Sequence, residues 1–365
     1  MGFKCGIVGL PNVGKSTLFN ALTSTQAAEA ANYPFCTIQP NTGRVGVPDP
    51  RLHKLAATAK SAKAVPTQLE FVDIAGLVRG ASKGEGLGNQ FLAHIREVDA
   101  ILHVLHCFAG DVAHVDGAVD PLRDAETVAT ELLLADMDGL ERRQEAAVKR
   151  ARGGDREAKA QLAMIERVLP ILQDGRPARA LSRAPEDEDP FAALQLLTAK
   201  QVLYVCNVDE ADAATSNDQS RRVAEMAAAE GAEAVVISAA IEAELAQLAD
   251  LEEMREFMTA LGLEQPGLNK VIGAGYRLLD LLTFFTAGPK QARAWTVRRG
   301  ATAPEAAGVV HTDFQRGFIR AETIDCDSYV ALGGEQAARD AGRMRQEGKD
   351  YVVQDGDVLL FRFNV

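Results

Sequence analysis

The sequence predicts an α/β fold with a mostly parallel sheet, an inserted helical hairpin and a small C-terminal α+β domain. Three observations indicate this arrangement. Short β-rich runs alternate with helix-length segments, a strandless stretch rich in Ala, Leu, Glu and Arg interrupts them, and short β-like runs separated by Gly and Asp follow Leu281. The chain has 365 residues, which at roughly 150 residues per domain corresponds to two or three domains.

Short apolar runs mark the strands of the expected sheet. They are Lys4–Gly9, Leu69–Ile74, Ala100–Phe108, Gln201–Cys206 and Ala234–Ile237. Runs of this length, separated by segments long enough for a helix, are typical of a parallel sheet that is flanked by helices.

The series of strands breaks between residues 124 and 199. Apolar residues there recur at helical spacing, as at Val128, Leu132 and Ala135, and Gly153-Gly154 is a natural turn in the middle. We therefore expect two long helices that form a hairpin, or coiled coil, inserted between strands of the sheet.

The C-terminal part has a different texture. Its β-like runs are Ala294–Val297, Gly317–Ile319, Tyr351–Val353 and Val358–Phe363, and Gly356-Asp357 suits a tight turn into the last run. The predicted domain boundaries are 1–123 and 200–280 for the two parts of the sheet domain, 124–199 for the hairpin and 281–365 for the C-terminal domain.

Composition excludes several classes of protein. With 47% hydrophobic and 25% charged residues the chain is globular, and no apolar run approaches the 18 or so residues that span a bilayer. The net charge of −12 argues against a general nucleic-acid coat, although a local basic patch is compatible with it. The N-terminus does not resemble a signal peptide.

Five scattered cysteines without a CxxC pair indicate neither a disulfide framework nor a zinc site, so we expect a reduced, cytoplasmic protein (Cys5, Cys36, Cys107, Cys206 and Cys326).

The strongest signal is a phosphate-binding loop. Gly9–Ser16 reads G-x-x-x-x-G-K-S, follows a predicted strand and opens a predicted helix over Ser16–Leu22. Glycines let backbone N–H groups point at a phosphate, Lys15 adds a mobile positive charge, and Ser16 offers a hydroxyl to Mg²⁺. The remaining predicted nucleotide contacts of this segment are Asn12, Val13, Gly14 and Thr17.

Two further segments complete the expected phosphate and metal site. Asp73-Ile-Ala-Gly76 ends a predicted strand, where the carboxylate can reach Mg²⁺ through water and the Gly76 N–H can reach the γ-phosphate. Thr37, in the loop Tyr33–Asn41 between the two motifs, is the candidate for a second hydroxyl on Mg²⁺.

With these motifs in place, the chain resembles the YchF ATPases, within the Obg-related branch of translation-factor P-loop proteins. The resemblance is carried by Gly6–Leu22, Tyr33–Asn41 and Asp73–Phe91, and it extends over essentially the whole length. It implies a P-loop G domain, an inserted helical hairpin and a C-terminal TGS domain with a ubiquitin-like fold, which match the three parts expected from the residues.

The choice of base is expected after the strand Gln201–Cys206. GTPases of this fold carry N-K-x-D there, but this chain reads Asn207-Val208-Asp-Glu210. The longer Glu210 side chain disturbs the paired hydrogen bonds to guanine, and Val208 removes the lysine that packs over the base. The resemblance implies ATP through this N-x-x-E signature. Ser238-Ala239, after the next predicted strand, is expected to offer polar groups to the base.

Three candidates remain for the group that promotes hydrolysis. Leu77, after the D-x-x-G motif, cannot orient a water as the glutamine of Ras-like enzymes does, so intrinsic turnover is expected to be slow. His114 is one candidate, because the family places a histidine in this loop. A K⁺ ion held near Asn12 is the second, and a group supplied by a partner is the third.

Two basic segments suggest a nucleic-acid partner. Residues 141–160, at the expected hairpin tip, carry seven basic and four acidic residues, and Lys290–Gly300 adds four basic residues and no acid, with Trp295 among them as a base-stacking or a core residue. The resemblance to ribosome-associated factors favours rRNA or a ribosomal subunit, and neither DNA nor a membrane is expected. The sequence thus predicts a slow Mg²⁺-dependent ATPase that acts as a conformational switch. The alternatives are a GTP-preferring switch and a non-catalytic, nucleotide-bound scaffold for RNA or the ribosome.

Overall fold

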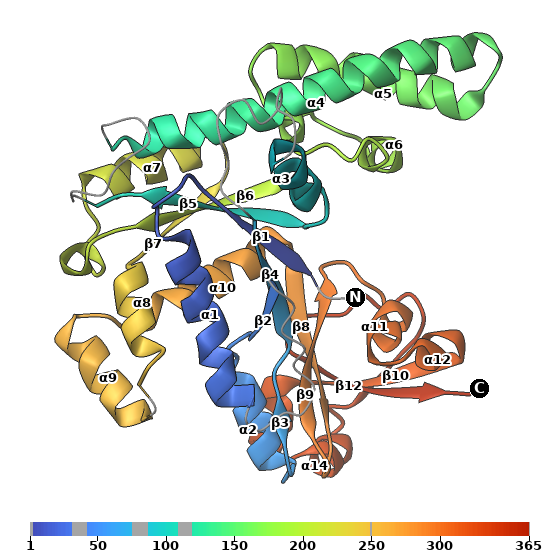
Figure 1. The fold of residues 1–365 in the computed structure, drawn as a ribbon. Coiled ribbons are helices and arrows are strands. Elements are labelled where there is room, and N and C mark those ends of the chain that lie inside the picture. The colour runs from blue at the N-terminus through green and yellow to red at the C-terminus, as the bar shows by residue number, and fades with distance from the viewer. Residues whose placement is uncertain (1–2, 31–41, 75–86, 109–118, 249, 365) are drawn as a thin grey trace. The chain divides into compact units, whose positions relative to one another are not determined.

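A computed structural model describes residues 3–30, 42–74, 87–108, 119–248 and 250–364. Contacts divide the chain into two units, and the chain passes between them within β2 (Thr42–Gly46) and β4 (Gln68–Asp73). The parallel-sheet unit consists of Phe3–Gly43 and Glu70–Gly275, and the mixed-sheet unit consists of Arg44–Leu69 and Tyr276–Val365 (Figure 1). No helix of the described residues is long and apolar enough to cross a membrane.

The parallel sheet confirms the expected α/β architecture. Its strand order is β2-β4-β1-β5-β6-β7, and the pairs β1–β4, β1–β5, β5–β6 and β6–β7 are all parallel. β5 is buried along its whole length because helices cover both faces of the sheet. All five predicted runs form strands, whereas β2 had no sequence prediction. The other strands are β1 (Lys4–Val8), β5 (Ala100–His106), β6 (Gln201–Asn207) and β7 (Glu233–Ile237).

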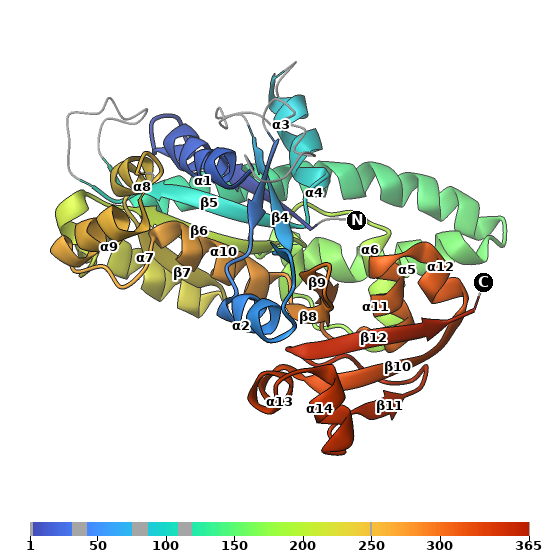
Figure 2. The same ribbon diagram turned by 90° about the horizontal axis from the view of Figure 1, so that it is seen from below.

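Helices lie on both faces of this sheet. α4 and α7 cover one face, while α1 and α8 lie on the other (Figures 1 and 2). The predicted helix Ser16–Leu22 is part of a longer one, which begins one residue earlier. The helices are α1 (Lys15–Ala30), α3 (Leu87–Arg96), α4 (Pro121–Arg152), α5 (Arg156–Gln173), α6 (Glu188–Ala192), α7 (Asp218–Ala229), α8 (Ala239–Leu245), α9 (Leu251–Ala260) and α10 (Gly267–Leu278), with short 3₁₀ turns η1 (Ala178–Ala180), η2 (Pro185–Asp187) and η3 (Glu210–Asp212).

The predicted helical hairpin is confirmed as α4 and α5. Each helix begins with an aspartate cap, since Asp120 accepts from the Leu122 N–H at 3.3 Å and Asp155 accepts from the Ala158 N–H at 3.1 Å. Gly154, at φ = 90°, reverses the chain between them. A buried cluster joins the two helices and the segment that follows (Leu140, Met164, Ile165, Val168, Leu172, Phe191 and Leu194).

A buried carboxylate fixes the base of the hairpin to the sheet. Asp136 of α4 accepts from the N–H groups of Leu197 and Thr198 at 2.9 and 2.8 Å and from the Thr198 hydroxyl at 2.7 Å. Burial raises the pKa of the Asp136 carboxyl, and these three hydrogen bonds oppose that shift. The long helix is therefore held at the point where the chain enters β6.

The mixed-sheet unit has the strand order β11-β10-β12-β8-β9-β3. The pairs β8–β9, β10–β12 and β10–β11 are antiparallel, whereas β12–β8 and β3–β9 are parallel. The strands are β3 (Ala64–Val65), β8 (Leu281–Ala287), β9 (Ala292–Arg298), β10 (Phe318–Asp325), β11 (Arg345–Glu347) and β12 (Asp357–Phe363), and the helices are α2 (Pro50–Thr58), α11 (Ala303–Val310), α12 (Thr312–Arg316), α13 (Cys326–Leu332) and α14 (Glu335–Asp340).

Several details of this unit differ from the sequence analysis. β3, β8 and β11 were not predicted. The expected strand Tyr351–Val353 is reduced to an isolated bridge between Val352 and Thr302, because the chain turns away after one pair. Arg44–Leu69 packs with the C-terminal part of the chain, whereas the predicted boundaries placed it with the rest of residues 1–123.

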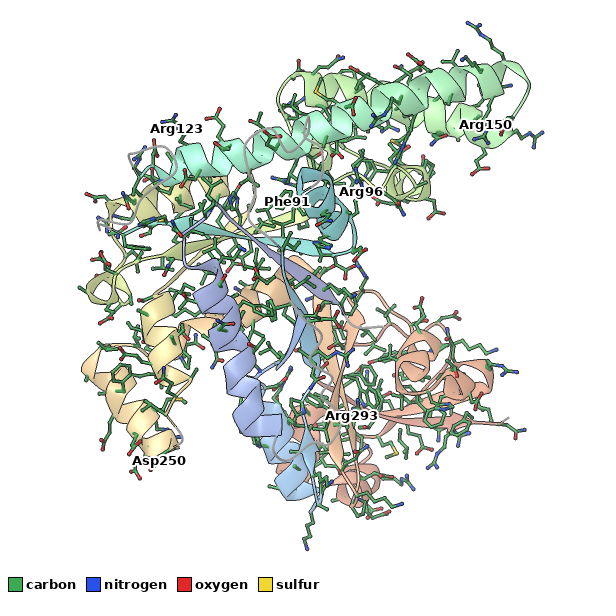
Figure 3. All side chains as sticks on the ribbon, in the orientation of Figure 1. Phe91, Arg96, Arg123, Arg150, Asp250 and Arg293 are labelled. Carbon is green, nitrogen blue, oxygen red and sulfur yellow. The ribbon has the colours of Figure 1, made fainter. Side chains whose placement is uncertain are left out.

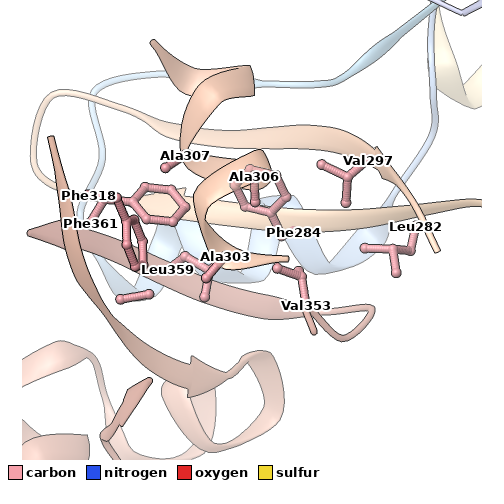
Figure 4. Close-up of a cluster of buried hydrophobic side chains, with 11 residues drawn as sticks. Leu282, Phe284, Val297, Ala303, Ala306, Ala307, Phe318, Val353, Leu359 and Phe361 are labelled. Atoms are coloured by element: carbon pink, nitrogen blue, oxygen red, sulfur yellow. The ribbon is translucent and has the colours of Figure 1, made fainter. Parts of the chain in front are cut away.

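The core of the mixed-sheet unit is built around aromatic rings (Figure 4). The Phe284 ring lies edge-on to Phe361, with centroids 6.1 Å apart, and stacks with Trp295 at 6.4 Å. The Trp295 N–H donates to the Thr286 hydroxyl, and the Arg293 guanidinium lies 4.0 Å from the Trp295 ring. These contacts favour the core role over the base-stacking role for Trp295.

One carboxylate of this unit is surrounded by arginines. Glu322 on β10 accepts from both Nε and Nη2 of Arg362, at 3.2 and 3.0 Å, while Arg339 and Arg320 approach to 3.4 and 3.6 Å. The hydrogen bonds from Arg362 hold the pKa of Glu322 below its usual value, although burial opposes them.

This lowered pKa predicts acid sensitivity. The ionised Glu322 stabilises the folded state above its unfolded pKa of 4.5, and the contribution is lost as pH falls through the lower folded pKa. The unfolding free energy of the native chain should therefore fall more steeply below about pH 5 than that of Glu322→Gln. Urea unfolding followed by the fluorescence of the single tryptophan, Trp295, measures it. The control Glu335→Gln, at an exposed pair with Arg339, should follow the native curve, and parallel curves for all three proteins would contradict the prediction.

Candidate nucleotide-binding site

The phosphate-binding loop lies between β1 and α1, as the motif requires. α1 begins at Lys15, and its first backbone bond runs from the Leu18 N–H to the Gly14 carbonyl at 2.9 Å. The N–H groups of the first helical turn therefore have no acceptor within the helix, which makes this end suited to an anion. Ser16 and Thr17 are exposed on that turn, so both hydroxyls are accessible to a ligand.

Glycine is required at the two ends of the loop by close approach of other chain segments. A Cβ on Gly9 would lie 2.7 Å from the Val104 carbonyl oxygen of β5. A Cβ on Gly14, which has φ = 90°, would lie 2.3 Å from the Asn207 side-chain nitrogen. The loop is thus packed directly against β5 and the end of β6, which fixes its position over the sheet edge.

The two charges predicted to act on phosphates and metal meet in the structure. The Lys15 ammonium donates to Asp73 Oδ1 at 3.0 Å, and both side chains are largely buried, with 10% and 19% exposure. Asp73 is the last residue of β4, which pairs with β1 in parallel. The carboxyl ends of both strands therefore lie at the same edge of the sheet, so Asp73 comes close to Lys15 in the segment that follows β1. A ligand phosphate or a cation at this edge would meet both charges.

Asn207, the last residue of β6, connects the phosphate loop to the start of α8. Its Nδ2 donates to the Val13 carbonyl at 3.0 Å, and its Oδ1 accepts from the Ala239 N–H at 2.8 Å. A carbonyl can only accept and an N–H can only donate, so these partners fix the orientation of the amide. The residue is 5% exposed, and both ends of its amide are engaged within the protein. In this structure Asn207 acts as a brace between the phosphate loop, β6 and α8.

The other predicted base-reading residues divide between buried and exposed positions. Val208 is buried, and its N–H donates to the Ile237 carbonyl at 2.8 Å. Ser238 is also buried, and the Ala239 N–H is held by Asn207. Glu210, the first residue of η3, is exposed and carries a carboxylate accessible to a base. Four predicted residues lie outside the described part of the chain, namely Thr37, Gly76, Leu77 and His114.

Two supporting residues were not found from the sequence. The Asn217 side chain donates to the Cys107 carbonyl at 2.7 Å and so holds the end of β5. The buried Glu242 accepts from the N–H groups of Gly267 and Leu268 at 2.7 and 3.1 Å and caps α10. Burial raises the pKa of the Glu242 carboxyl, and these hydrogen bonds oppose the shift. The N-x-x-S pattern at Asn217 indicates a helix cap, but no sequence signal points to a partner 110 residues away.

The described residues contain four cysteines. Cys5, Cys107, Cys206 and Cys326 are buried free thiols, in line with the absence of a disulfide framework. No cluster of three or more His, Cys, Asp or Glu side chains in this part of the chain is suited to a metal ion. A P-loop magnesium site needs no such cluster, because phosphate oxygens and waters supply most of its ligands.

The basic residues of the hairpin tip fall into two groups. Arg143 donates to the Leu194 carbonyl, and Arg142 and Arg150 pair with Asp138 and Asp155. Four others are exposed and make no ion pair with the described residues (Lys149, Arg152, Arg156 and Lys159). Figure 3 shows Arg150 at the far end of the hairpin from Arg123, so this basic group projects away from the sheet. In the second basic segment, Arg293 covers Trp295 and Arg299 pairs with Asp280 at 2.9 Å.

Comparison with known proteins identifies the family. Relatives named "Ribosome-binding ATPase YchF" are 58% identical in Haemophilus influenzae and 50% identical in Bacillus subtilis, each over 100% of both chains. The chain belongs to the YchF family. The solved "Structure of the Schizosaccharomyces pombe YchF GTPase" superposes with a TM-score of 0.89 at 38% identity, covering 99% of this chain and 98% of that one.

Two family models match separate parts of this YchF chain. A model described as "50S ribosome-binding GTPase" matches residues 4–133, which contain the phosphate loop and Asp73. A second, YchF-GTPase_C, described as "Protein of unknown function (DUF933)", matches residues 281–364, most of the mixed-sheet unit. The full-length matches and these two models support the P-loop fold with a helical insertion and a C-terminal domain.

The Asn207 brace generates a prediction. Asn207→Ala leaves the Val13 carbonyl and the Ala239 N–H without their partner, so we expect unfolding to become easier by about 1–3 kcal/mol and nucleotide affinity to fall. Urea unfolding and titration with a fluorescent nucleotide measure the two effects. Asn20→Ala, at an exposed position of α1, serves as the matched control and should change neither. An unchanged free energy of unfolding in Asn207→Ala would show that the amide does not stabilise the fold.

Proposed function

We propose that this chain is a slow, Mg²⁺-dependent ATPase that binds the ribosome and acts as a nucleotide-controlled conformational switch in the cytoplasm. The observation that carries the proposal is the combination, in one YchF chain, of a complete P-loop with an N-x-x-E base signature. The name shared by its full-length relatives, which describes a ribosome-binding ATPase, supports the same activity.

The described residues fit a magnesium–nucleotide complex. The exposed Ser16 hydroxyl and the Asp73 carboxylate, paired with Lys15, belong to one edge of the sheet. In our proposal Ser16 and Thr37 hold Mg²⁺, Asp73 supports it through water, and Lys15 binds the phosphates together with the N–H groups of the loop. The metal, when bound, neutralises phosphate charge. Gly76, beyond the described residues, is proposed to hold the γ-phosphate.

Adenine preference is assigned to Glu210 and to the absence of a lysine. Val208 is buried and apolar, so no cation at this position packs over the base. The exposed Glu210 carboxylate is set one methylene further from the backbone than the aspartate that pairs with guanine, which weakens guanine binding. The Ala239 N–H already donates to Asn207, so it is not available to the base. In our proposal the Ser238-Ala239 segment therefore contributes to the shape of the base pocket more than to hydrogen bonding.

Base choice can be tested by competition. ATP should displace a fluorescent adenine nucleotide from the native chain at a concentration at least about tenfold lower than GTP. Glu210→Asp restores the guanine-reading carboxylate and should narrow that ratio, whereas Glu225→Asp, on the exposed side of α7, should not. Tighter binding of GTP than of ATP by the native chain would favour the GTP-preferring switch and end the adenine proposal.

The hydrolytic group is proposed to be His114, a K⁺ ion near Asn12, or a partner's side chain. Asn12 has a left-handed backbone, at φ = 66°, which positions it at the turn of the phosphate loop. Phosphate release measured in K⁺ and in Na⁺, with and without ribosomes, and for His114→Ala, separates the three routes. No turnover under any of these conditions would favour the non-catalytic scaffold.

Ribosome binding is assigned in part to the four exposed basic residues of the hairpin tip. Positive charges that carry no internal partner gain most from phosphate contact, because counterions are released when they bind. Residues 281–365 are proposed as a TGS domain with a ubiquitin-like fold. The hairpin β8–β9, the helix α11 and the return strand β12, parallel to β8, support this assignment.

The tip charges predict a salt-dependent interaction. Replacing Lys149, Arg152, Arg156 and Lys159 by alanine should weaken co-sedimentation with ribosomes and flatten its dependence on salt by up to about one unit of slope per lost phosphate contact. Arg142→Ala, in α4 and already paired with Asp138, is the matched control and should have a small effect. If the fourfold variant binds like the native chain at every salt concentration, the tip is not the ribosome contact.

A further inference from the structure

A cavity of about 370 Å³ lies inside the parallel-sheet unit. Its walls come from α4, from α7 and from β5 and β6, and the segment 175–179 contributes to its lining. The volume is within the range of about 300–1,000 Å³ that is typical of small-molecule sites. None of the described residues predicted to bind phosphate, metal or base lines it, so in this part of the chain the cavity is separate from the nucleotide site.

Most of the lining is apolar. α4 supplies Leu122, Val128 and Leu132, the strands supply Ile101 and Val202, and Met226 of α7 closes the opposite side. Such walls give a flat or branched hydrocarbon good dispersion contacts, and they offer little to a strongly hydrated ion.

Two of the three charged side chains of the lining, Arg179 and Glu230, pair with each other, and the third, Glu126, is exposed on α4. The Tyr204 hydroxyl donates to Glu230 at 3.1 Å, and Arg179 pairs with the same carboxylate at 3.3 Å. The charges of Arg179 and Glu230 therefore compensate each other. An uncharged ligand leaves this pair intact.

His103 is the polar residue of the wall that the protein does not satisfy. It is 3% exposed, and its Nε2 has no hydrogen-bond partner among the described residues. Burial lowers its pKa to about 4, so the ring is neutral at physiological pH and has one nitrogen that accepts. Since Nε2 itself is buried, the neutral ring adds no charge to the wall of the cavity.

We propose that this cavity is a binding site for an uncharged, mainly apolar ring compound. The occupant would contact both the inserted hairpin, through α4, and the central strands. β6 contributes Val202 and Tyr204 to the wall and ends at Asn207, which holds the phosphate loop. The site therefore lies on the strand that connects the hairpin region to the nucleotide site.

The test uses N-phenyl-1-naphthylamine, an uncharged two-part aromatic amine whose fluorescence rises in apolar surroundings. Titration of the full chain should give a saturable signal with one site. Ala129→Phe, which places a ring at the α4 wall, should raise the Kd of the dye at least about tenfold. Ala146→Phe is the matched control, since it is another exposed alanine of α4 outside the cavity, and its Kd should stay within about twofold of native.

A second measurement does not depend on any substitution. Benzophenone, irradiated with the native chain, should label peptides from α4, β5, β6 or α7, and excess dye should suppress this labelling. A dye signal that does not saturate, an unchanged Kd in Ala129→Phe, or labelling spread over the surface would overturn the proposal. These outcomes are independent of ATP hydrolysis and ribosome binding, so they leave the proposed function unaffected.

Discussion

The amide of Asn207 is the contact on which the candidate site depends. It joins the phosphate loop to α8 through one donor and one acceptor, while Gly14 leaves the space that the amide occupies. A phosphate-binding loop gains affinity only when its N–H groups are held in position before the ligand arrives. This residue supplies that rigidity from β6, so the strand that ends at the base-reading segment also fixes the segment that reads phosphate.

The helical hairpin has one end fixed to the sheet and one end free. At its base, Asp136 is buried and bonded to Leu197 and Thr198, so α4 is anchored at the start of β6. At its tip, Lys149, Arg152, Arg156 and Lys159 are exposed and make no ion pair with the described residues. A long helix with one anchored end transmits displacement along its axis better than a flexible loop of the same length would. The arrangement is suited to coupling a distant contact to the sheet.

Local patterns in the sequence account for much of what was predicted. The strands, the hairpin and the phosphate loop each carry their signal within a few residues, and the Lys15–Asp73 pair follows from the parallel pairing of β1 with β4. The features that the sequence did not predict depend on contacts between residues far apart in the chain. The pairing of Ala64 with Ala292 has no local signature, so the sequence offered no reason to group Arg44–Leu69 with the C-terminal part of the chain, as the contacts do. The same holds for Asn217 and Cys107, while Trp295 was undecided until its contacts with Phe284 and Arg293 were known.

The passage of Arg44–Leu69 into the mixed-sheet unit has a consequence for the order of events during synthesis. α2 turns Leu52 and Leu55 toward residues of the C-terminal sheet, such as Phe285, which are made more than 200 residues later. A nascent chain must therefore carry an amphipathic helix with its apolar face uncovered through most of its translation. Premature termination before Tyr276 would release a polypeptide with that helix uncovered, a substrate for chaperones or proteases, and residues 281–365 alone would lack one edge of their sheet.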